Sequence, residues 1–248
     1  MIYFISDVHL GLGEREADKQ RERDLIKVLQ KIEKDCEKLF IVGDLFDYWF
    51  EYATVIPRFH IRTIAAIAGL RDRGIPIEYV MGNHDFGHRD FFKTELDIEV
   101  FGTDIEREIG GKKFYIGHGD GKAFNDTGYL ILKKILRAPI SLKLWQWLHP
   151  DIGIGLAAGT SRKSRGYTDQ READKWKNGE KDGLEDFAEK RIADGFDYVI
   201  MGHRHKPVIK LFKNGFYVNL GDWLVNRTFG RFDGEKMEIL KVDEFLKE

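Results

Sequence analysis

Five short apolar runs of this chain each lead directly into a polar motif, and this repeated arrangement limits the fold more than any other feature of the sequence. Short runs rich in Ile, Val and aromatic residues are typical of buried strands. The carboxyl ends of strands in an α/β sheet line one crevice, so we expect the motifs to converge there. The motifs are Asp7-Val8-His9, Gly43-Asp44-Leu45-Phe46-Asp47, Gly82-Asn83-His84-Asp85, His118-Gly119-Asp120 and Gly202-His203-Arg204-His205.

The pattern between the runs predicts an α/β fold. Asp24–Ile32 and Phe59–Leu70 have apolar residues at helical spacing, so the chain alternates between strand and helix. After Phe101, a Gly110-Gly111 turn favours a hairpin in a mixed sheet, and Lys236–Val242 is a candidate further strand. The strands that we predict are Ile2–Ile5, Leu39–Val42, Ile77–Met81, Phe114–Ile116, Tyr198–Met201 and Phe216–Leu220.

Size and composition limit the class of protein. The chain has 248 residues, which favours a single domain over residues 1–248 with an insertion. It has one cysteine, Cys36, and no apolar run near the roughly 20 residues of a membrane-spanning helix, so we expect a cytoplasmic protein without an internal disulfide. A net charge of -2 gives no overall attraction to nucleic acid, and we expect no such partner.

The motifs supply two carboxylates, one amide and four imidazoles, which together form a set of metal ligands. One divalent ion would use about four to six of these groups, whereas two ions that share a carboxylate can use them all. Asp44 is our candidate for that shared ligand. Oxygen and imidazole donors without thiolate favour Mn²⁺, with Fe²⁺, Zn²⁺ or Mg²⁺ as alternatives. The seven groups are Asp7, His9, Asp44, Asn83, His118, His203 and His205.

Such a pair of ions can activate water and neutralise phosphoryl charge, which predicts hydrolysis of a phosphoester or an anhydride. We assign His84 to the leaving group or to charge in the transition state, with Asp85 orienting its ring. Asp47 and Asp120 are expected to support the site rather than bind metal. Three further histidines, His60, His88 and His149, are left outside the site.

The ordered motifs SDVH, GDLFD, GNHD, GHGD and GHRH resemble those of the calcineurin-like metallophosphoesterases, from Ile2 to about Asp222. The resemblance implies a four-layer α/β/β/α sandwich with a two-metal centre. By this likeness, one metal is held by Asp7, His9, Asp44 and His205. The other is held by Asp44, Asn83, His118 and His203.

A narrower resemblance is to the UDP-2,3-diacylglucosamine diphosphatases of lipid A synthesis, which release UMP and an acylated sugar 1-phosphate. This chain has His84 where several members of that group carry Arg. The stretches that carry the resemblance are Gly43–Tyr52, the HGDG motif with Asn125–Tyr129, Ser161–Arg165, Gly202–Pro207 and Gly221-Asp222-Trp223.

Residues 122–165 form a candidate helical cap. They contain eight Lys or Arg residues and two Asp, a local charge of +6, interleaved with apolar residues. One interpretation is a cap at the inner membrane surface that offers apolar surface to acyl chains and cations to a diphosphate. The other is an ordinary helical hairpin that packs on the core or on another subunit. The resemblance favours the cap. Its candidate substrate contacts are Asp126, Tyr129, Arg162, Lys163 and Arg165, beside Asn83, His84 and His203 at the metals.

The leading hypothesis is therefore a two-metal enzyme that cleaves the diphosphate of a UDP-linked acylated glucosamine. A soluble phosphodiesterase or nucleotidase on the same scaffold is the first alternative. A nuclease is disfavoured because the basic excess is confined to one apolar segment. A non-catalytic scaffold would have no need of the complete ligand set.

Overall fold

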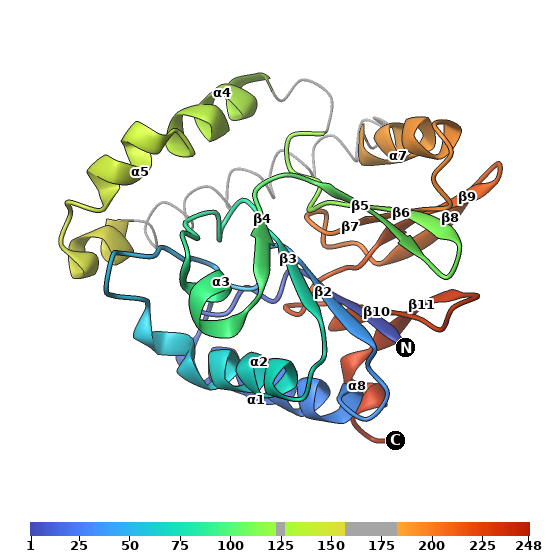
Figure 1. Ribbon diagram of the computed structural model, residues 1–248, viewed down its shortest axis with the longest axis horizontal. Coiled ribbons are helices and arrows are strands. Elements are labelled where there is room, and N and C mark those ends of the chain that lie inside the picture. Colours follow the sequence, from blue (N-terminus) through green and yellow to red (C-terminus); the bar gives the residue numbers. More distant parts are fainter. Residues whose placement is uncertain (123–126, 157–182) are drawn as a thin grey trace.

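The fold consists of two β-sheets that pack face to face, with helices on both outer sides (Figure 1). This computed structural model describes residues 1–122, 127–156 and 183–248, of which residues 127–129 and 132 as backbone only. The first sheet has the order β11-β10-β1-β2-β3-β4 and the second β5-β6-β7-β9-β8. The first sheet contains β1 (Ile2–Ile5), β2 (Lys38–Val42), β3 (Ile77–Val80), β4 (Glu99–Phe101), β10 (Thr228–Phe232) and β11 (Met237–Lys241).

The second sheet is mixed, as the sequence predicts. Strands β6, β7 and β9 run parallel, whereas β5 and β8 pair antiparallel to their neighbours. Strands β5 and β6 form the expected hairpin around Gly110-Gly111. The strands of this sheet are β5 (Ile105–Ile109), β6 (Lys112–Ile116), β7 (Tyr198–Met201), β8 (Val208–Phe212) and β9 (Gly215–Asn219).

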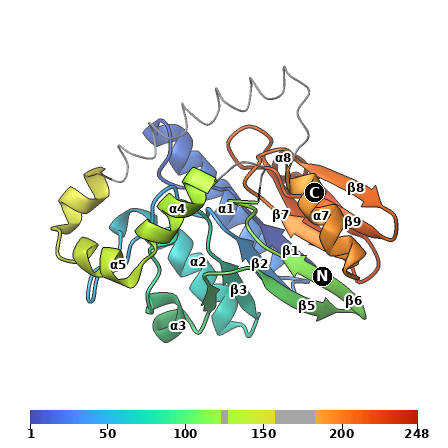
Figure 2. The same cartoon turned by 90° about the horizontal axis from the view of Figure 1, so that it is seen from above.

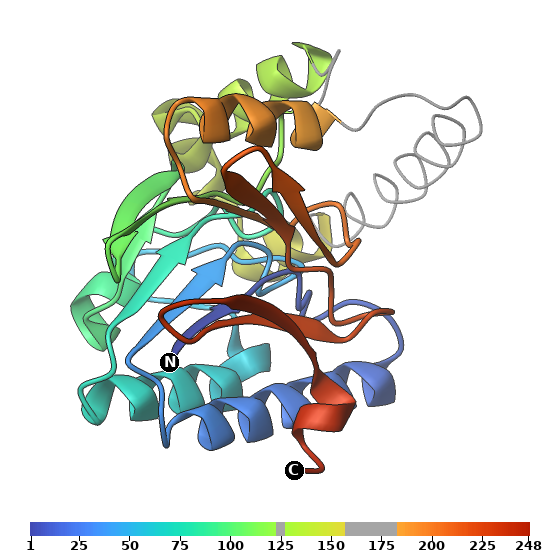
Figure 3. The ribbon, with the colours of Figure 1, turned by 90° about the vertical axis from the view of Figure 1, so that its right-hand side faces the viewer.

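Helices complete a four-layer order that is visible from the side in Figure 3. Helices α1, α2 and α8 cover the first sheet, and α7 covers the second. The expected α/β/β/α arrangement is therefore confirmed. The helices are α1 (Arg15–Ile32), α2 (Ile61–Asp72), α3 (Phe91–Leu96), α4 (Thr127–Leu136), α5 (Pro139–Trp145), α7 (Gly183–Ala193) and α8 (Val242–Phe245), with a 3₁₀ turn at Arg58–His60.

The alternation of side chains along each strand separates the apolar residues into distinct cores. In β1, Tyr3 and Ile5 face α1 and α2, whereas Ile2 and Phe4 face the second sheet, because successive residues of a strand point to opposite faces. A third core lies between the second sheet and α7, where Leu184 and Ala188 are fully buried. Both faces of each central strand are therefore covered, which explains why these strands are continuously apolar.

Helix α1 begins at Arg15, nine residues before the helix that the sequence predicts. Its first half has almost no apolar residues, so its helical periodicity is not visible. Tertiary contacts stabilise this half instead. Arg21 is buried and donates hydrogen bonds to the carbonyl oxygens of His9 at 2.9 Å and Leu12 at 2.8 Å. These bonds attach α1 to the loop that follows β1.

The cap is helical where the structure describes it. Helices α4 and α5 and the helical residues 150–156 lie beside the sheets, on the other side of the molecule from β8 and β9 (Figure 2). Several apolar side chains of the cap are exposed, with Ile140 at 74%, Leu144 at 68% and Trp147 at 84%. Within the described parts of the chain, we find no helix with the length and hydrophobicity needed to cross a bilayer.

Candidate metal centre

The five motifs converge at the carboxyl ends of β1, β2, β3, β6 and β7, as the sequence predicts. Neighbouring strand exits are joined by backbone hydrogen bonds, from the Asp7 N–H to the Gly43 carbonyl at 3.1 Å and from the Gly202 N–H to the His118 carbonyl at 3.0 Å. Asp7, Asp44 and His118 are each no more than 1% exposed. Side chains up to about 200 positions apart in the sequence thus lie in one cluster, which we call the pocket.

The backbone is strained at five of the seven predicted ligands. These residues have positive φ angles, an uncommon conformation for side chains other than glycine, although Asp and His adopt it more often than most. Such strain persists only where the surrounding structure imposes it, and it is typical of functional sites. The five residues are Asp7 (52°), His9 (49°), Asp44 (52°), His203 (67°) and His205 (52°).

Three glycines leave room for the ligands. A Cβ atom on Gly43 would overlap the His118 ring, one on Gly82 would overlap the Asp44 carboxylate, and one on Gly202 would overlap Asp7. Because of these close approaches, the residue before the predicted ligand at each of these strand exits has to be glycine.

Asp7, His9 and His205 form one group that can hold a metal ion. The Nε2 atoms of the two imidazoles lie 3.2 Å apart, and the Asp7 Oδ1 atom lies 3.1 Å from His205 Nε2 and 3.6 Å from His9 Nε2. Among the described residues, none donates a well-formed hydrogen bond to this buried oxygen. A divalent cation between the three atoms would satisfy all of them, so these residues fit a metal.

Asp7, Asp44 and His118 form a second group that can hold a metal ion. Asp44 Oδ2 is 3.2 Å from His118 Nε2 and 3.8 Å from His9 Nε2, so it lies between the second group and His9 of the first. Asn83 Oδ1 is 3.1 Å from His118 Nε2. His203 belongs to none of the groups identified as possible metal sites, but its ring centroid lies 5.2 Å from that of His118.

The electrostatics of the pocket favour bound cations. Burial alone would raise the pKa of the Asp7 and Asp44 carboxyls, but His118 and the other imidazoles hold both far below the usual range. Conversely, burial would lower the pKa of His118, whereas Asp44 and Asp7 raise it well above the ordinary value. Burial and the neighbouring His118 lower the pKa of His203 to about 4, so this ring is neutral and available as a ligand at neutral pH.

Asp47, rather than Asp85, orients His84, and this corrects the sequence-based expectation. The Nδ1 atom of His84 lies 3.3 Å from the Asp47 carbonyl oxygen and 3.5 Å from its Oδ1. The carboxylate of Asp85 instead accepts hydrogen bonds from the N–H groups of Leu45 at 2.9 Å and Gly82 at 2.7 Å, and from the Tyr79 hydroxyl. Asp85 therefore joins two loops, and its bonds are to backbone and tyrosine.

His205 has a similar support that sequence reasoning missed. Its Nδ1 atom lies 3.6 Å from Asp222 Oδ2, and its carbonyl oxygen accepts a hydrogen bond from the Asn226 side chain at 2.7 Å. Carboxylates behind metal-ligating histidines commonly fix the ring and its tautomer. In the sequence, the only sign was the position of Asp222 in the Gly221-Asp222-Trp223 stretch.

The remaining predicted site residues belong to the cap. Asp126, Arg162, Lys163 and Arg165 lie outside the described residues. The backbone of Tyr129 is part of α4, and its side chain is also outside the description.

The three histidines left out of the site have other surroundings. His60 and His88 are buried, and His88 Nδ1 is 3.3 Å from Glu51 Oε1. His149 is exposed on the cap, next to Asp151. None of the three belongs to a group that could hold a metal among the described residues.

Comparison with known proteins identifies a family whose model covers all five motifs. The family model of the calcineurin-like phosphoesterases matches residues 1–207. The chain belongs to the calcineurin-like phosphoesterase family. As a member of this family, it is a metal-dependent hydrolase.

Its relatives match over nearly their whole length. A UDP-2,3-diacylglucosamine hydrolase of Porphyromonas gingivalis is 32% identical over 256 residues, which cover 98% of both chains. The protein of the same name from Yersinia pseudotuberculosis serotype O:1b is 25% identical and covers 96% of this chain and 97% of that protein. Among solved structures, an archaeal phosphodiesterase matches at 15% identity with a TM-score of 0.49, covering 96% of this chain and 98% of that one.

Proposed function

We propose that this protein hydrolyses the diphosphate of UDP-2,3-diacylglucosamine to UMP and the acylated glucosamine 1-phosphate. The observation that carries the proposal is the 32% identity to a UDP-2,3-diacylglucosamine hydrolase across 98% of both chains. The ligand groups at the strand ends support it, since they suit metal-dependent cleavage of a phosphoanhydride.

In this proposal, two divalent ions, preferentially Mn²⁺, bind in the pocket. Asp7, His9, Asp44 and His205 hold one, and Asp44, Asn83, His118 and His203 hold the other. The position of Asp44 Oδ2 between His9 and His118 favours it as the shared ligand. When bound, the ions would activate water and neutralise charge on the phosphoryl oxygens.

His84 is the proposed catalytic side chain. Asp47 contacts the Nδ1 edge of the ring, and we assign the opposite edge, Nε2, to the substrate. From there, it can donate a proton to the departing phosphate or a hydrogen bond to the developing charge. The side chain of His84 is 15% exposed, whereas that of His9 is 1% exposed, which agrees with contact to a ligand entering from solvent. Asn83 and His203 complete the proposed contacts to the phosphoryl group.

The cap is proposed to hold the acyl chains and to contact the inner membrane surface. Its exposed apolar residues support this role, because large exposed apolar groups in a basic segment are typical of lipid-binding surfaces. Asp126, Tyr129, Arg162, Lys163 and Arg165 remain proposed contacts to the sugar, nucleotide or phosphate. A cytoplasmic location with peripheral membrane association follows from this role.

The test is cleavage by the Mn²⁺-loaded protein of three substrates: UDP-2,3-diacylglucosamine, its deacylated form and a nitrophenyl phosphodiester. We expect the acylated substrate to have the highest kcat/KM and to yield UMP. His118→Ala should lower kcat/KM for every substrate by at least about 100-fold. As a matched control, His149→Ala removes an exposed imidazole outside the metal centre and should leave cleavage of the nitrophenyl phosphodiester, which has no acyl chains to contact the cap, unchanged. Equal or faster cleavage of the simple diester would contradict the proposed substrate and favour a soluble phosphodiesterase.

A further inference from the structure

Two cations of the cap face the metal centre. Lys133 and Arg137 are four positions apart, and the Arg137 N–H donates to the Lys133 carbonyl at 3.0 Å, so the helical turn continues through Arg137. Residues at this spacing lie on the same side of a helix. The exposed apolar residues Ile131 and Ile135 belong to the same helix. Helix α4 and the turn that continues it therefore offer both apolar surface and a pair of cations directed toward the loops after β3 and β6.

Lys133 pairs with a carboxylate next to the metal ligands. Its Nζ atom is 2.6 Å from Asp120 Oδ2, and Asp120 follows His118 by two residues. The Asp120 side chain is only 5% exposed. A carboxylate this deeply buried needs a charged partner, and the cap supplies Lys133 together with Arg137, whose Nη2 atom lies 4.0 Å from the same Oδ2 atom.

Arg137 contacts the loop after β3, which carries Asn83 and His84. It donates a hydrogen bond from Nη2 to the Gly82 carbonyl oxygen at 2.6 Å, and its guanidinium lies 5.4 Å from the centre of the Phe86 ring. The Gly82 carbonyl belongs to the peptide that joins Gly82 to Asn83. The bond therefore fixes the backbone immediately before Asn83 and His84, and Arg137 touches this loop on both sides of the two residues.

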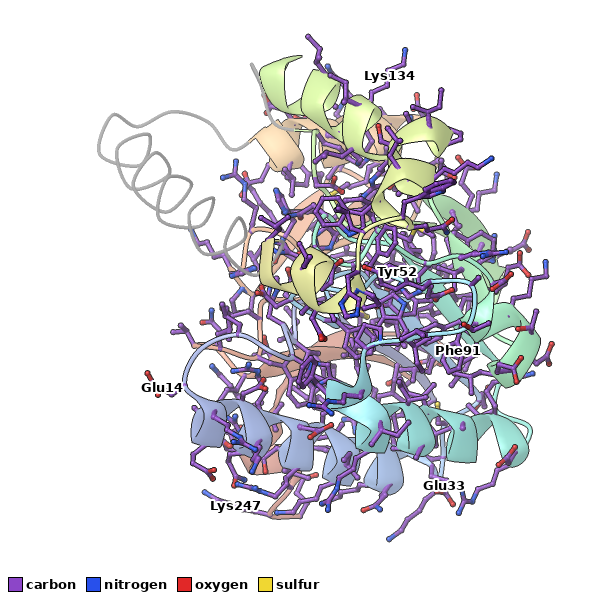
Figure 4. The ribbon with its side chains drawn as sticks, turned by 90° about the vertical axis from the view of Figure 1, so that its left-hand side faces the viewer. Glu14, Glu33, Tyr52, Phe91, Lys134 and Lys247 are labelled. Atoms are coloured by element: carbon purple, nitrogen blue, oxygen red, sulfur yellow. The ribbon has the colours of Figure 1, made fainter. Side chains whose placement is uncertain are left out.

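A second contact joins the cap to the loop after β2, which carries Asp47. Trp145 of α5 donates from Nε1 to the Tyr48 hydroxyl at 3.1 Å, and its ring lies 6.1 Å from that of Phe50. Tyr48 follows Asp47, the residue that orients His84. Tyr52 of this loop lies beside the helical residues 150–156 (Figure 4). Both loops that carry His84 and its support are thus in contact with the cap.

We propose that Arg137 is a positioning residue that couples occupation of the cap by acyl chains to the alignment of Asn83 and His84. The inference rests on the proposed function. When acyl chains bind to α4, they hold the helix in place, and Arg137 then holds the Gly82 carbonyl. Part of the lipid-binding energy therefore raises kcat instead of only lowering KM. The planar guanidinium suits this role because it can bond the carbonyl while lying against Phe86.

The experiment compares kcat and KM of wild type, Arg137→Gln and Arg137→Lys on UDP-2,3-diacylglucosamine and on its deacylated form, with saturating Mn²⁺. We expect Arg137→Gln to lower the ratio of the acylated kcat to the deacylated kcat about tenfold, the size of one lost charged hydrogen bond. Arg137→Lys, which keeps a charged donor, should recover part of that ratio. Lys134→Gln is the matched control, because Lys134 is exposed on the outer part of the same helix (Figure 4).

The outcomes separate this inference from the proposed function. An equal loss of kcat on both substrates would make Arg137 a merely structural residue and overturn the coupling, as would a ratio that does not change. If wild type fails to cleave the acylated substrate, the proposed function fails and takes the coupling with it. Amide exchange of residues 82–86 is the second readout, and we expect it to be faster in both Arg137 variants than in Lys134→Gln. Unchanged exchange there would also overturn the coupling.

Discussion

Asp47 and Asp85 are neighbouring carboxylates of the centre with different partners, and the difference can be measured. Asp47 Oδ1 lies 3.6 Å from His9 Nδ1 and 3.5 Å from His84 Nδ1, so it supports a proposed metal ligand and the proposed catalytic histidine together. Asp85 contacts Tyr79 and two backbone N–H groups instead. Removal of the first charge should affect chemistry, and removal of the second should affect folding.

We therefore expect Asp47→Asn to lower kcat or metal affinity by about 10- to 100-fold, the usual effect of losing a carboxylate behind a ligand. Asp85→Asn should cost about 1–3 kcal/mol of unfolding free energy, because one of its buried hydrogen bonds loses its acceptor. Steady-state kinetics with metal titration and urea unfolding, applied to both variants, measure the two effects. A larger loss of kcat in Asp85→Asn, at equal stability, would restore Asp85 as the residue that orients His84.

Individual site residues could be predicted from the sequence where they belong to a motif at a strand end. Asp7, Asn83 and His118 each stand two positions after the end of an apolar run, so their convergence follows from strand ends alone. The contact of Arg137 with Gly82 could not be predicted, since the two residues are 55 positions apart and meet only when α4 docks. Asp85 was assigned wrongly because sequence adjacency to His84 says nothing about the direction of either side chain.

At the scale of elements, Glu51 joins the loop after β2 to the start of α3. Its Oε2 atom accepts the N–H groups of Arg89, Asp90 and Phe91 at 2.7, 2.8 and 3.0 Å, and its Oε1 atom accepts the Trp49 N–H at 2.9 Å. Burial would raise the pKa of Glu51, but His88 and these donors lower it to about 2. The charged form is therefore the one that stabilises the fold.

A stability profile against pH follows from this pKa. Because the folded pKa is below the ordinary 4.5, the contribution of Glu51 is fully present above pH 4.5 and is lost as the pH falls through about 2. Glu51→Gln should reduce the unfolding free energy by about 3 kcal/mol at pH 7, and by less at pH 3. Urea unfolding of both proteins at the two pH values measures this. A difference that is the same at both pH values would contradict the assignment.

Strand β10 and the N-terminal half of α1, which the sequence did not predict, lack a local signal. Strand β10 contains Gly230 and Arg231, which interrupt the apolar pattern, and tertiary packing explains the glycine. A Cβ atom there would meet Met237, Leu220 and Phe4. The N-terminal half of α1 depends in the same way on the contacts of Arg21 with the loop after β1. Strand β11, by contrast, keeps its own apolar pattern and lies within the predicted range Lys236–Val242.

At the scale of the whole molecule, the two sheets bring the strand ends of both halves of the chain to one pocket. The first sheet supplies Asp7, Asp44 and Asn83, and the second supplies His118 and His203. Neither sheet alone contains the complete ligand set. The interface between the sheets, which has a core of hydrophobic residues, therefore fixes the geometry of the proposed two-metal centre.

Anomalous diffraction from crystals of the Mn²⁺-loaded protein tests the two-metal centre most directly. We expect two peaks about 3.5–4 Å apart, with the Asp44 carboxylate bridging them. His205 should bind one ion and His118 the other. A single peak, or two peaks without contact to Asp44, would contradict the two-metal centre.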